Sequence, residues 1–153
     1  MRTHADVSER NLTALKGLLA VRDAVKDWMT VQVVAFPQDG LYGHSPANQT
    51  TNEQLMEEAL RLGADVVGGI PHYELTREDG VRSVHRIFEL AQQYSRLIDI
   101  HCDEIDDPHS RFLEVMAACC IRTGLKQEVT ASHTTAFGSY NDAYAFKLMG
   151  ILK

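Results

Sequence analysis

The sequence predicts an α/β fold with a parallel sheet of about five strand–helix units. Short apolar runs rich in Val and Ile alternate with longer stretches whose apolar residues recur at helical spacing. The apolar runs begin near residues 1, 31, 65, 97 and 128, so successive starts are 30 to 34 residues apart. That spacing fits one strand and one crossover helix per unit, and such crossovers join parallel strands.

The candidate strands are short and almost continuously apolar, which is typical of parallel strands buried on both faces. We predict them at the five apolar runs, roughly residues 1–7, 31–37, 65–71, 97–102 and 128–132. The first intervening helix is predicted from Leu12, Leu15 and Leu19, with Ser8 as its N-cap. Residues 43–52 are polar and are predicted to form one long surface loop.

The second helix is predicted to begin at Thr51, because Gln54 is placed to complete a capping box, and to end at Gly63. Three further helices are predicted from apolar residues at helical spacing, the middle one of them ending at Gly124. Their apolar faces are Val81, Val84, Ile87, Phe88 and Ala91, then Phe112, Val115, Met116 and Cys119, then Tyr140, Tyr144, Leu148 and Ile151.

Five such units fit two architectures. A doubly wound sheet of flavodoxin-like size is complete at 153 residues. A (β/α)8 TIM barrel needs about 250 residues, so this chain would supply a partial barrel. Length favours the first architecture, whereas the residues at the strand ends favour the second. The chain has no linker and no shift in composition, which predicts a single domain over residues 1–153.

Composition and charge exclude several classes of function. Fifteen Lys and Arg stand against 21 Asp and Glu, for a net charge of −6, and no basic run is present to bind nucleic acid. The longest apolar runs are about half a membrane span, and the first residues do not form a signal peptide. Three cysteines do not make a disulfide framework. We therefore expect a soluble, cytoplasmic protein with neither a nucleic-acid nor a membrane partner.

Each candidate strand runs into polar residues at its carboxyl end. These groups are His4-Ala5-Asp6, Gln38-Asp39, His72-Tyr73-Glu74, His101-Cys102-Asp103-Glu104 and Ser132-His133-Thr134-Thr135. In a barrel they all meet at one mouth, where the catalytic groups of such barrels lie. In a doubly wound sheet, only those beside the switch point meet.

The histidines in these groups differ in their claim to a function. His101 is the strongest candidate for a metal ligand or an acid–base group, because it ends an apolar strand and an acidic loop follows it. His133 has a similar claim. His4 is interpreted as structural or solvated, His72 as a hydrogen-bonded structural histidine, and Gln38 equally as a turn residue or a binding residue. Solvated positions are predicted for His44, His85 and His109.

Motifs for two other chemistries do not occur in the sequence. It has no G-x-S-x-G turn for serine-based acyl transfer, and neither a G-x-x-x-x-G-K-[ST] loop nor a G-x-G-x-x-G turn for binding phosphates. Cys119 and Cys120 are predicted to be packed thiols. The chemistry that remains after these two are set aside is hydrolysis by a metal-bound water, with a carboxylate that moves protons.

Four segments resemble the bacterial cytosine deaminases of the amidohydrolase superfamily, whose fold is a metal-bearing (β/α)8 barrel. They are residues 33–40 (VVAFPQDG), 57–68 (EEALRLGADVVG), 97–107 (LIDIHCDEIDD) and 129–135 (VTASHTT). The resemblance is colinear over essentially all 153 residues and corresponds to barrel strands two to six. Deaminases of isocytosine, creatinine and N-isopropylammelide share parts of this pattern.

The resemblance implies hydrolytic deamination of a pyrimidine or a related aminated heterocycle, with release of ammonia. His101 would ligate the single divalent metal, iron or zinc. Glu104 would shuttle a proton from the metal-bound water to the ring nitrogen, and His133 would hydrogen-bond the resulting hydroxide. Gln38 would bind the amide-like edge of the ring, since a carboxamide offers both a donor and an acceptor.

The sequence departs from the family pattern in its metal ligands. It contains no His-x-His pair, which ends the family's first strand, and no counterpart of the last strand's aspartate. Catalytic zinc sites use about three protein ligands, so His101 alone does not retain a metal. We therefore expect a fragment or a truncated product that is inactive alone, and whose open strand edges lead it to self-associate. The alternatives are a non-catalytic homologue or interaction module, and a flavodoxin-like domain that binds a small ligand.

Overall fold

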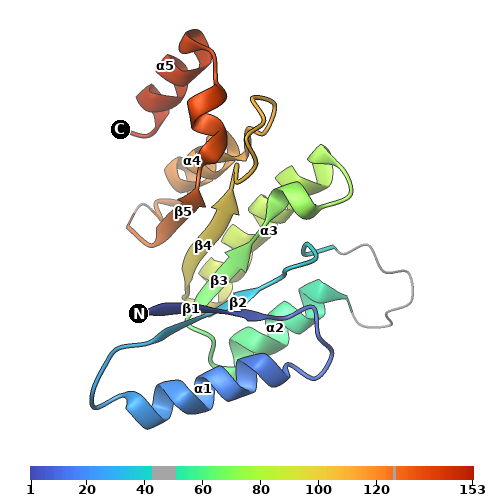
Figure 1. Ribbon diagram of the computed structural model, residues 1–153, viewed down its shortest axis with the longest axis vertical. Coiled ribbons are helices and arrows are strands. Elements are labelled where there is room, and N and C mark those ends of the chain that lie inside the picture. Colours follow the sequence, from blue (N-terminus) through green and yellow to red (C-terminus); the bar gives the residue numbers. More distant parts are fainter. Residues whose placement is uncertain (43–50, 126) are drawn as a thin grey trace.

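A computed structural model describes residues 1–42, 51–125 and 127–153, and the structural statements below concern these residues. Five parallel strands form one sheet in the order β1-β2-β3-β4-β5 (Figure 1). They are β1 (Arg2–Asp6), β2 (Gln32–Phe36), β3 (Val66–Gly69), β4 (Leu97–Cys102) and β5 (Val129–His133). A strand order that follows the chain order is that of a barrel, whereas a doubly wound sheet reverses its order at a switch point. The partial-barrel prediction is confirmed, and the flavodoxin-like alternative is wrong.

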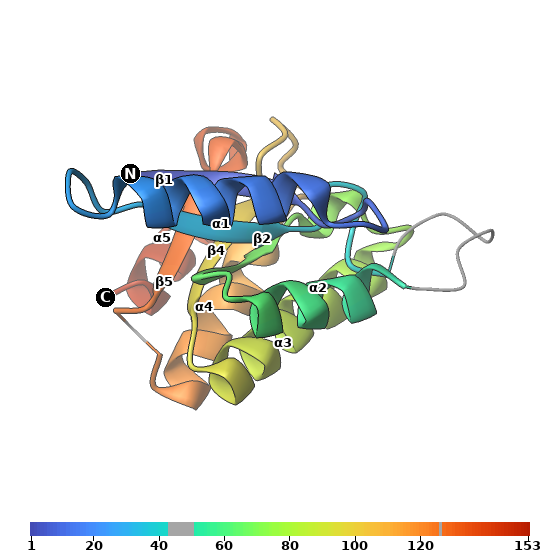
Figure 2. The ribbon, with the colours of Figure 1, turned by 90° about the horizontal axis from the view of Figure 1, so that it is seen from below.

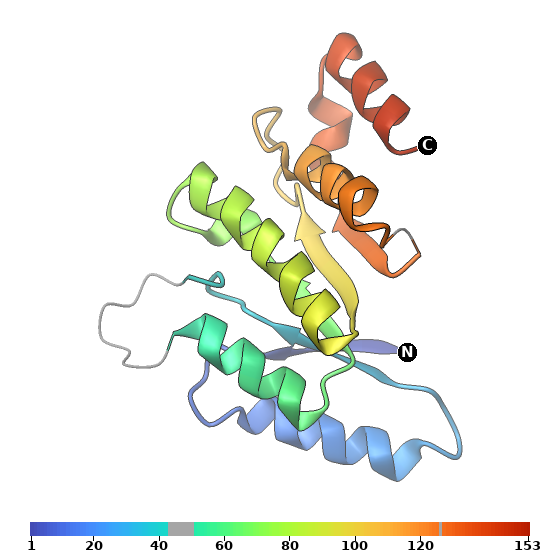
Figure 3. The same cartoon turned by 180° about the vertical axis from the view of Figure 1, so that it is seen from behind.

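The five α-helices lie side by side on one face of the sheet (Figures 2 and 3). They are α1 (Thr13–Val25), α2 (Asn52–Leu62), α3 (Arg77–Tyr94), α4 (Phe112–Thr123) and α5 (Asp142–Ile151). Two short 3-10 helices, η1 (Pro71–Tyr73) and η2 (Thr135–Ser139), follow β3 and β5. None of the described helices combines the length and the apolarity needed to cross a bilayer.

The main core lies between the sheet and the helices. Every second residue of a strand points to the helices, and in β4 these are Ile98, Ile100 and Cys102, each fully buried. The helices contribute the residues that their apolar spacing predicted, among them Leu15, Leu55, Ile87, Phe88 and Met116. The apolar spacing therefore placed most of the core correctly.

A second, smaller cluster lies on the opposite, concave face of the sheet. It contains Val34, Phe36, Val66 and Ile70, all buried. β3 supplies Gly68 here, where a Cβ atom would lie 2.7 Å from the carbonyl oxygen of Ala35. A side chain at this position would therefore push β2 and β3 apart.

An ionic network crosses the concave face and joins β1 to β4 and β5. The Arg2 guanidinium Nη1 donates to Asp99 Oδ2 at 2.9 Å and to Thr130 Oγ1 at 3.0 Å. Ser132 Oγ donates to the other oxygen of Asp99 at 2.6 Å. Since β1 and β4 are separated in the sheet by β2 and β3, these contacts require a strongly curved sheet. This curvature brings the ends of β1 and β4 within reach of each other.

The structure tests several predicted details of the helices and loops, and some of them differ. Ser8 is not the N-cap of α1: Leu12 occupies that position with φ 49° and no side-chain cap, and its buried side chain fixes the helix start by packing. The capping box of α2 is confirmed by both hydrogen bonds between Thr51 and Gln54, at 3.2 and 3.0 Å. Tyr140 precedes α5, which Asn141 caps, instead of lying within it. Residues 43–50 of the predicted loop, with His44, lie outside the described residues.

A buried carboxylate holds the loops that follow β4 and β5. Asp103 is 0% exposed and accepts hydrogen bonds from the backbone amides of Phe112 at 2.8 Å and Leu113 at 3.0 Å, at the start of α4. Its carboxylate also accepts from Ser110 Oγ at 2.9 Å and from the Tyr140 hydroxyl at 2.8 Å. Asp103, although it begins the acidic loop after His101, is therefore not solvated. A buried charge is tolerated here because four donors surround it.

Replacing Asp103 with asparagine should destabilise the fold strongly. The carboxamide keeps one acceptor oxygen but turns an N–H₂ group toward groups that also donate, so we expect a loss of about 2–4 kcal/mol in the free energy of unfolding. Urea denaturation would measure it. The matched control is Asp106→Asn, at an exposed position in the same loop, with an expected loss below about 1 kcal/mol. Equal losses in the two variants would contradict the role given to Asp103.

Candidate functional site

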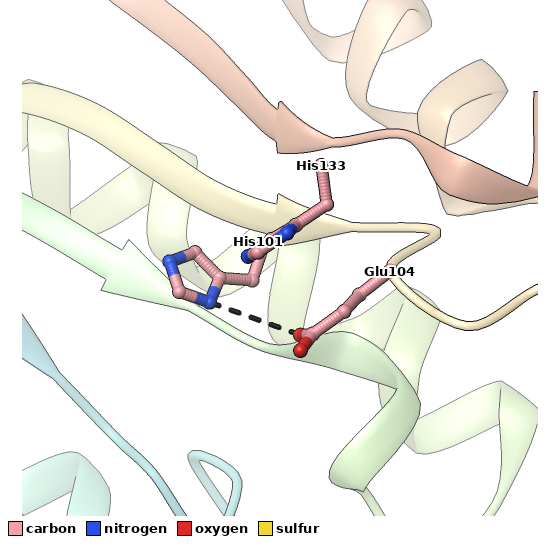
Figure 4. A group of neighbouring side chains, drawn as sticks. All are labelled: His101, Glu104 and His133. Atoms are coloured by element: carbon pink, nitrogen blue, oxygen red, sulfur yellow. Dashed lines mark ion pairs between the residues drawn. The ribbon is translucent and has the colours of Figure 1, made fainter.

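The carboxyl ends of β4 and β5 bring three predicted site residues together. His101, Glu104 and His133 each offer a ligand atom, and these atoms all lie within 4.8 Å of one another (Figure 4). His101 Nδ1 is 3.8 Å from Glu104 Oε2, the pair joined by the dashed line in Figure 4. We refer to these three residues as the strand-end cluster.

Strand alternation explains the position of His101. In β4, Ile98, Ile100 and Cys102 point to the helices, so Asp99 and His101 point to the concave face. The concave face is the inside of the curved sheet, where side chains from distant strands approach one another. His101 therefore lies where a barrel collects its catalytic groups.

A left-handed backbone explains the position of His133. In register, His133 pairs with Cys102, so simple alternation would turn its side chain toward the helices. Its φ of 71° breaks this alternation, and Thr134 follows with φ 54°. The imidazole rings of His133 and His101 consequently meet edge to face, with centroids 4.5 Å apart.

Glu104 owes its position to the residue before it. Asp103 also has a left-handed backbone, with φ 50°, and its carboxylate is held under the start of α4. The chain therefore turns sharply after β4, and the Glu104 side chain returns toward His101. Glu104 Oε2 is buried and has no hydrogen-bond partner among the described residues. A buried carboxylate oxygen without a donor is costly, which makes a bound group at this point favourable.

Two further histidines adjoin the strand-end cluster. The ring of His4 is 5.0 Å from that of His101, and His72 Nε2 is 4.0 Å from Glu104 Oε2. His4, predicted to be structural or solvated, is exposed, and its ring also contacts that of His101. The prediction that His72 is hydrogen-bonded is wrong at Nδ1, which is buried without a partner in the described part of the chain. His109 is exposed as predicted, whereas His85 Nδ1 lies 3.3 Å from the Cys119 sulfur.

Desolvation lowers the pKa of three of these imidazoles and so favours their neutral form. Desolvation lowers the pKa of His4, against the opposing charge of Asp99. Desolvation likewise lowers the pKa of His72, although Glu104 acts in the opposite direction. The pKa of His101 is lowered by desolvation and further by the neighbouring His4 and His133. A neutral imidazole is the form that binds a metal.

The donors of the strand-end cluster fit a divalent transition metal. Imidazole and carboxylate groups bind zinc and iron, and two histidines with one carboxylate are a recurrent set. The unpartnered oxygen of Glu104 is available to accept a hydrogen bond or a proton beside His101. His101 is the member that alternation alone directs into the concave face.

Gln38 is not among the converging residues. It is exposed in the turn after β2 and the buried Pro37, at the same edge of the sheet as His101. Its role in binding a substrate stays a prediction.

Comparison with known proteins agrees with this geometry. The family model described as "Amidohydrolase family" matches residues 3–152. The structure of 5-methylcytosine deaminase from Klebsiella pneumoniae liganded with phosphonocytosine is 52% identical with a TM-score of 0.92, covering 99% of this chain and 36% of that chain. The N-isopropylammelide isopropylaminohydrolase of Burkholderia multivorans is 29% identical with a TM-score of 0.81, covering 99% and 37%.

Among curated proteins, the chain matches a related hydrolase at a lower sequence identity than the Klebsiella deaminase. The N-isopropylammelide isopropyl amidohydrolase of a Pseudomonas species is 34% identical over 138 residues, which are 89% of this chain and 32% of that protein. The chain spans about a third of the length of the curated relatives it matches. Since the family model covers nearly every residue, the chain belongs to the amidohydrolase family.

Proposed function

We propose that this chain carries part of the active site of a hydrolase that deaminates cytosine, 5-methylcytosine or a related aminated heterocycle and releases ammonia. The observation that supports this most is the convergence of His101, Glu104 and His133 at the ends of β4 and β5. Two of the similar solved structures are of 5-methylcytosine deaminase, with phosphonocytosine and with 5-fluorocytosine bound. Both ligands are small neutral or anionic heterocycles of a size that an enclosed barrel mouth accepts.

The proposed roles follow from the position of each side chain. His101 would hold the divalent metal, iron or zinc, which when bound supplies a nucleophile by lowering the pKa of water from about 15.7 toward about 7. Glu104, beside His101, accepts the proton of the attacking water and passes it to the ring nitrogen. His133 would donate a hydrogen bond to the oxygen that attacks the ring carbon, and Gln38 would bind the amide-like edge of the ring. The exocyclic amine would then take the remaining proton of the added hydroxyl, the C–N bond would break as the carbonyl forms, and ammonia would leave.

We propose that residues 1–153 form one structural unit of an incomplete barrel and that further metal ligands come from outside it. The proposed roles give the metal only His101, and the sequence has no His-x-His pair, so the unit does not retain a metal at useful affinity by itself. The same observation favours a second candidate, a non-catalytic homologue that acts as an interaction module. Two of the similar proteins are named as hydrolases of N-isopropylammelide. The substrates tested should therefore include that compound.

The test is ammonia release from a chimera in which this chain replaces the matched segment of the Klebsiella 5-methylcytosine deaminase. The close match in structure makes the exchange feasible. We expect release from 5-methylcytosine or cytosine in the presence of zinc or iron, and none from the 153-residue chain alone. Glu104→Gln should lower kcat by about 10²–10⁴-fold, since it removes the proton acceptor. Glu78→Gln, at an exposed site in α3, should leave it unchanged. An inactive chimera, or an active Glu104→Gln variant, would contradict the proposal.

The neutral imidazoles should make the stability of the fold depend on pH. The pKa of His4, His72 and His101 is lower in the folded chain than the unfolded value of about 6.5, so between those values the unfolded chain binds more protons. The free energy of unfolding is then highest above pH 6.5 and falls as the pH decreases, by at most about 1.4 kcal/mol per pH unit for each histidine.

Urea denaturation between pH 7.5 and 5.5 would measure this dependence. His4→Gln removes one of the three groups and should flatten the slope, whereas His109→Gln, at an exposed site, should not. Burial raises the pKa of Glu74, which acts in the opposite direction but equally in all variants. A slope unaffected by His4→Gln would contradict the prediction.

We further propose that the isolated chain self-associates. In the described residues β1 and β5 each pair with one strand, which leaves an open edge at both ends of the sheet. A groove of about 740 Å³ beside β5 is lined largely by apolar residues, and Ile121 at its rim is 58% exposed.

Light scattering should give a mass above 17.1 kDa. Ile121→Lys should reduce that mass and Leu75→Lys, exposed outside the groove, should not. A single 17.1 kDa species at all concentrations would contradict the proposal.

A further inference from the structure

The fold holds the His72 imidazole in a buried position where its Nδ1 has no hydrogen-bond partner in the described part of the chain. It lies in η1, directly after β3, and its side chain is 9% exposed. A buried imidazole normally hydrogen-bonds through at least one nitrogen. Here Nδ1 is buried without a partner in the described residues, and the ring contacts Tyr73 at 4.8 Å between centroids.

The fold holds η1 tightly against the helix layer. Gly80 of α3 lies so close that a Cβ atom there would be 2.6 Å from the carbonyl oxygen of Pro71 and 2.6 Å from the Phe112 ring. The absence of a side chain at Gly80 therefore lets η1 and the start of α4 approach α3. The position of the His72 ring is set by this packing, and it faces the loop that carries Glu104.

Glu104 Oε2 lies between two imidazole nitrogens. His101 Nδ1 is 3.8 Å away and His72 Nε2 is 4.0 Å away. Both distances exceed a hydrogen bond, and Oε2 has no other partner among the described residues. A small rotation of the Glu104 side chain would close either distance. Catalytic hydrogen bonds are commonly long before a substrate binds and shorten in the complex.

The two imidazoles differ in whether they are available to hydrogen-bond Glu104. The proposed function assigns His101 to the metal, which takes up one of its ring nitrogens. His72 is free of that assignment, and its Nε2 lies 4.0 Å from Glu104 Oε2, a buried carboxylate oxygen that lacks a donor among the described residues. A long, flexible side chain that moves protons needs such a neighbour to fix its orientation.

We propose that His72 is a positioning residue, which donates its Nε2–H to Glu104 Oε2 and so holds the proton-shuttling carboxylate beside His101. This inference rests on the proposed function of Glu104. It predicts the neutral Nε2–H tautomer of His72, with Nδ1 as an unprotonated acceptor. A role in packing alone would leave the tautomer independent of Glu104.

The test is NMR spectroscopy of the full 153-residue chain, which needs neither a metal nor turnover. Long-range ¹H–¹⁵N spectra of the imidazoles at pH 7.5 report the tautomer, and loss of one set of signals in His72→Gln assigns His72. We expect the Nε2–H form, with ¹⁵N signals that shift in Glu104→Gln and not in Glu78→Gln. An Nδ1–H tautomer, or signals that ignore Glu104→Gln, would overturn the proposal.

A second measurement uses the carboxyl ¹³C signal of Glu104 as the readout. His72→Leu, which has similar bulk and no donor, should shift that signal, and His72→Gln, which keeps an N–H group, should largely restore it. Equal shifts in both variants would indicate packing alone and overturn the proposal. Because neither readout uses ammonia release, failure here is distinguishable from failure of the proposed function.

Discussion

The carboxylate of Asp103 is the constraint on which the rest of the site depends. It is fully buried, and its donors come from the loop after β4, the start of α4 and the segment before α5. Its backbone carbonyl in addition accepts from the amide of Ala136, in η2 after β5 at 3.1 Å. A buried charge persists only where such donors are in place, so the loops that follow the two strands cannot move independently. Glu104 and His133 lie in or beside these loops. The hydrogen bonds of Asp103 therefore fix their position relative to each other.

The strand-end cluster also depends on a departure from regular strand geometry. Asp103, His133 and Thr134 all have left-handed backbones, and none is a glycine. Each such residue costs of order 1 kcal/mol or more unless its surroundings stabilise it. At Asp103 the hydrogen bonds to α4 provide that stabilisation. At Thr134 the amide donates to the carbonyl of Cys102 at 3.0 Å, which extends the pairing of β4 and β5 beyond the turn. Three of the five described non-glycine residues with left-handed backbones are thus those that turn His133 and Glu104 toward His101.

The sequence was sufficient for features that depend on local pattern and not for those that depend on curvature. The strands, the capping box at Thr51 and the position of His101 follow from periodicity and short-range hydrogen bonding. The contact of His4 with His101 does not, because it joins β1 to β4 across a curved sheet. The sequence pattern of residues 103–107 is typical of a solvated acidic loop. The burial of Asp103 could not be predicted from it, because the groups that donate to its carboxylate lie up to 37 residues away. His133 could be named from its place at a strand end, but its direction depends on one φ angle.

A strand that completes the sheet also brings side chains to the proposed metal site. The convex face is covered by helices, and among the described residues the only unpaired strand edges are those of β1 and β5. A strand that pairs in parallel with either edge places its carboxyl end beside that of its neighbour. At the β1 edge that end lies next to His4, whose ring already touches His101, and at the β5 edge it lies next to His133. Any polypeptide that closes an open edge with a parallel strand therefore presents its strand-end side chains to the strand-end cluster, where the proposed metal site needs further ligands.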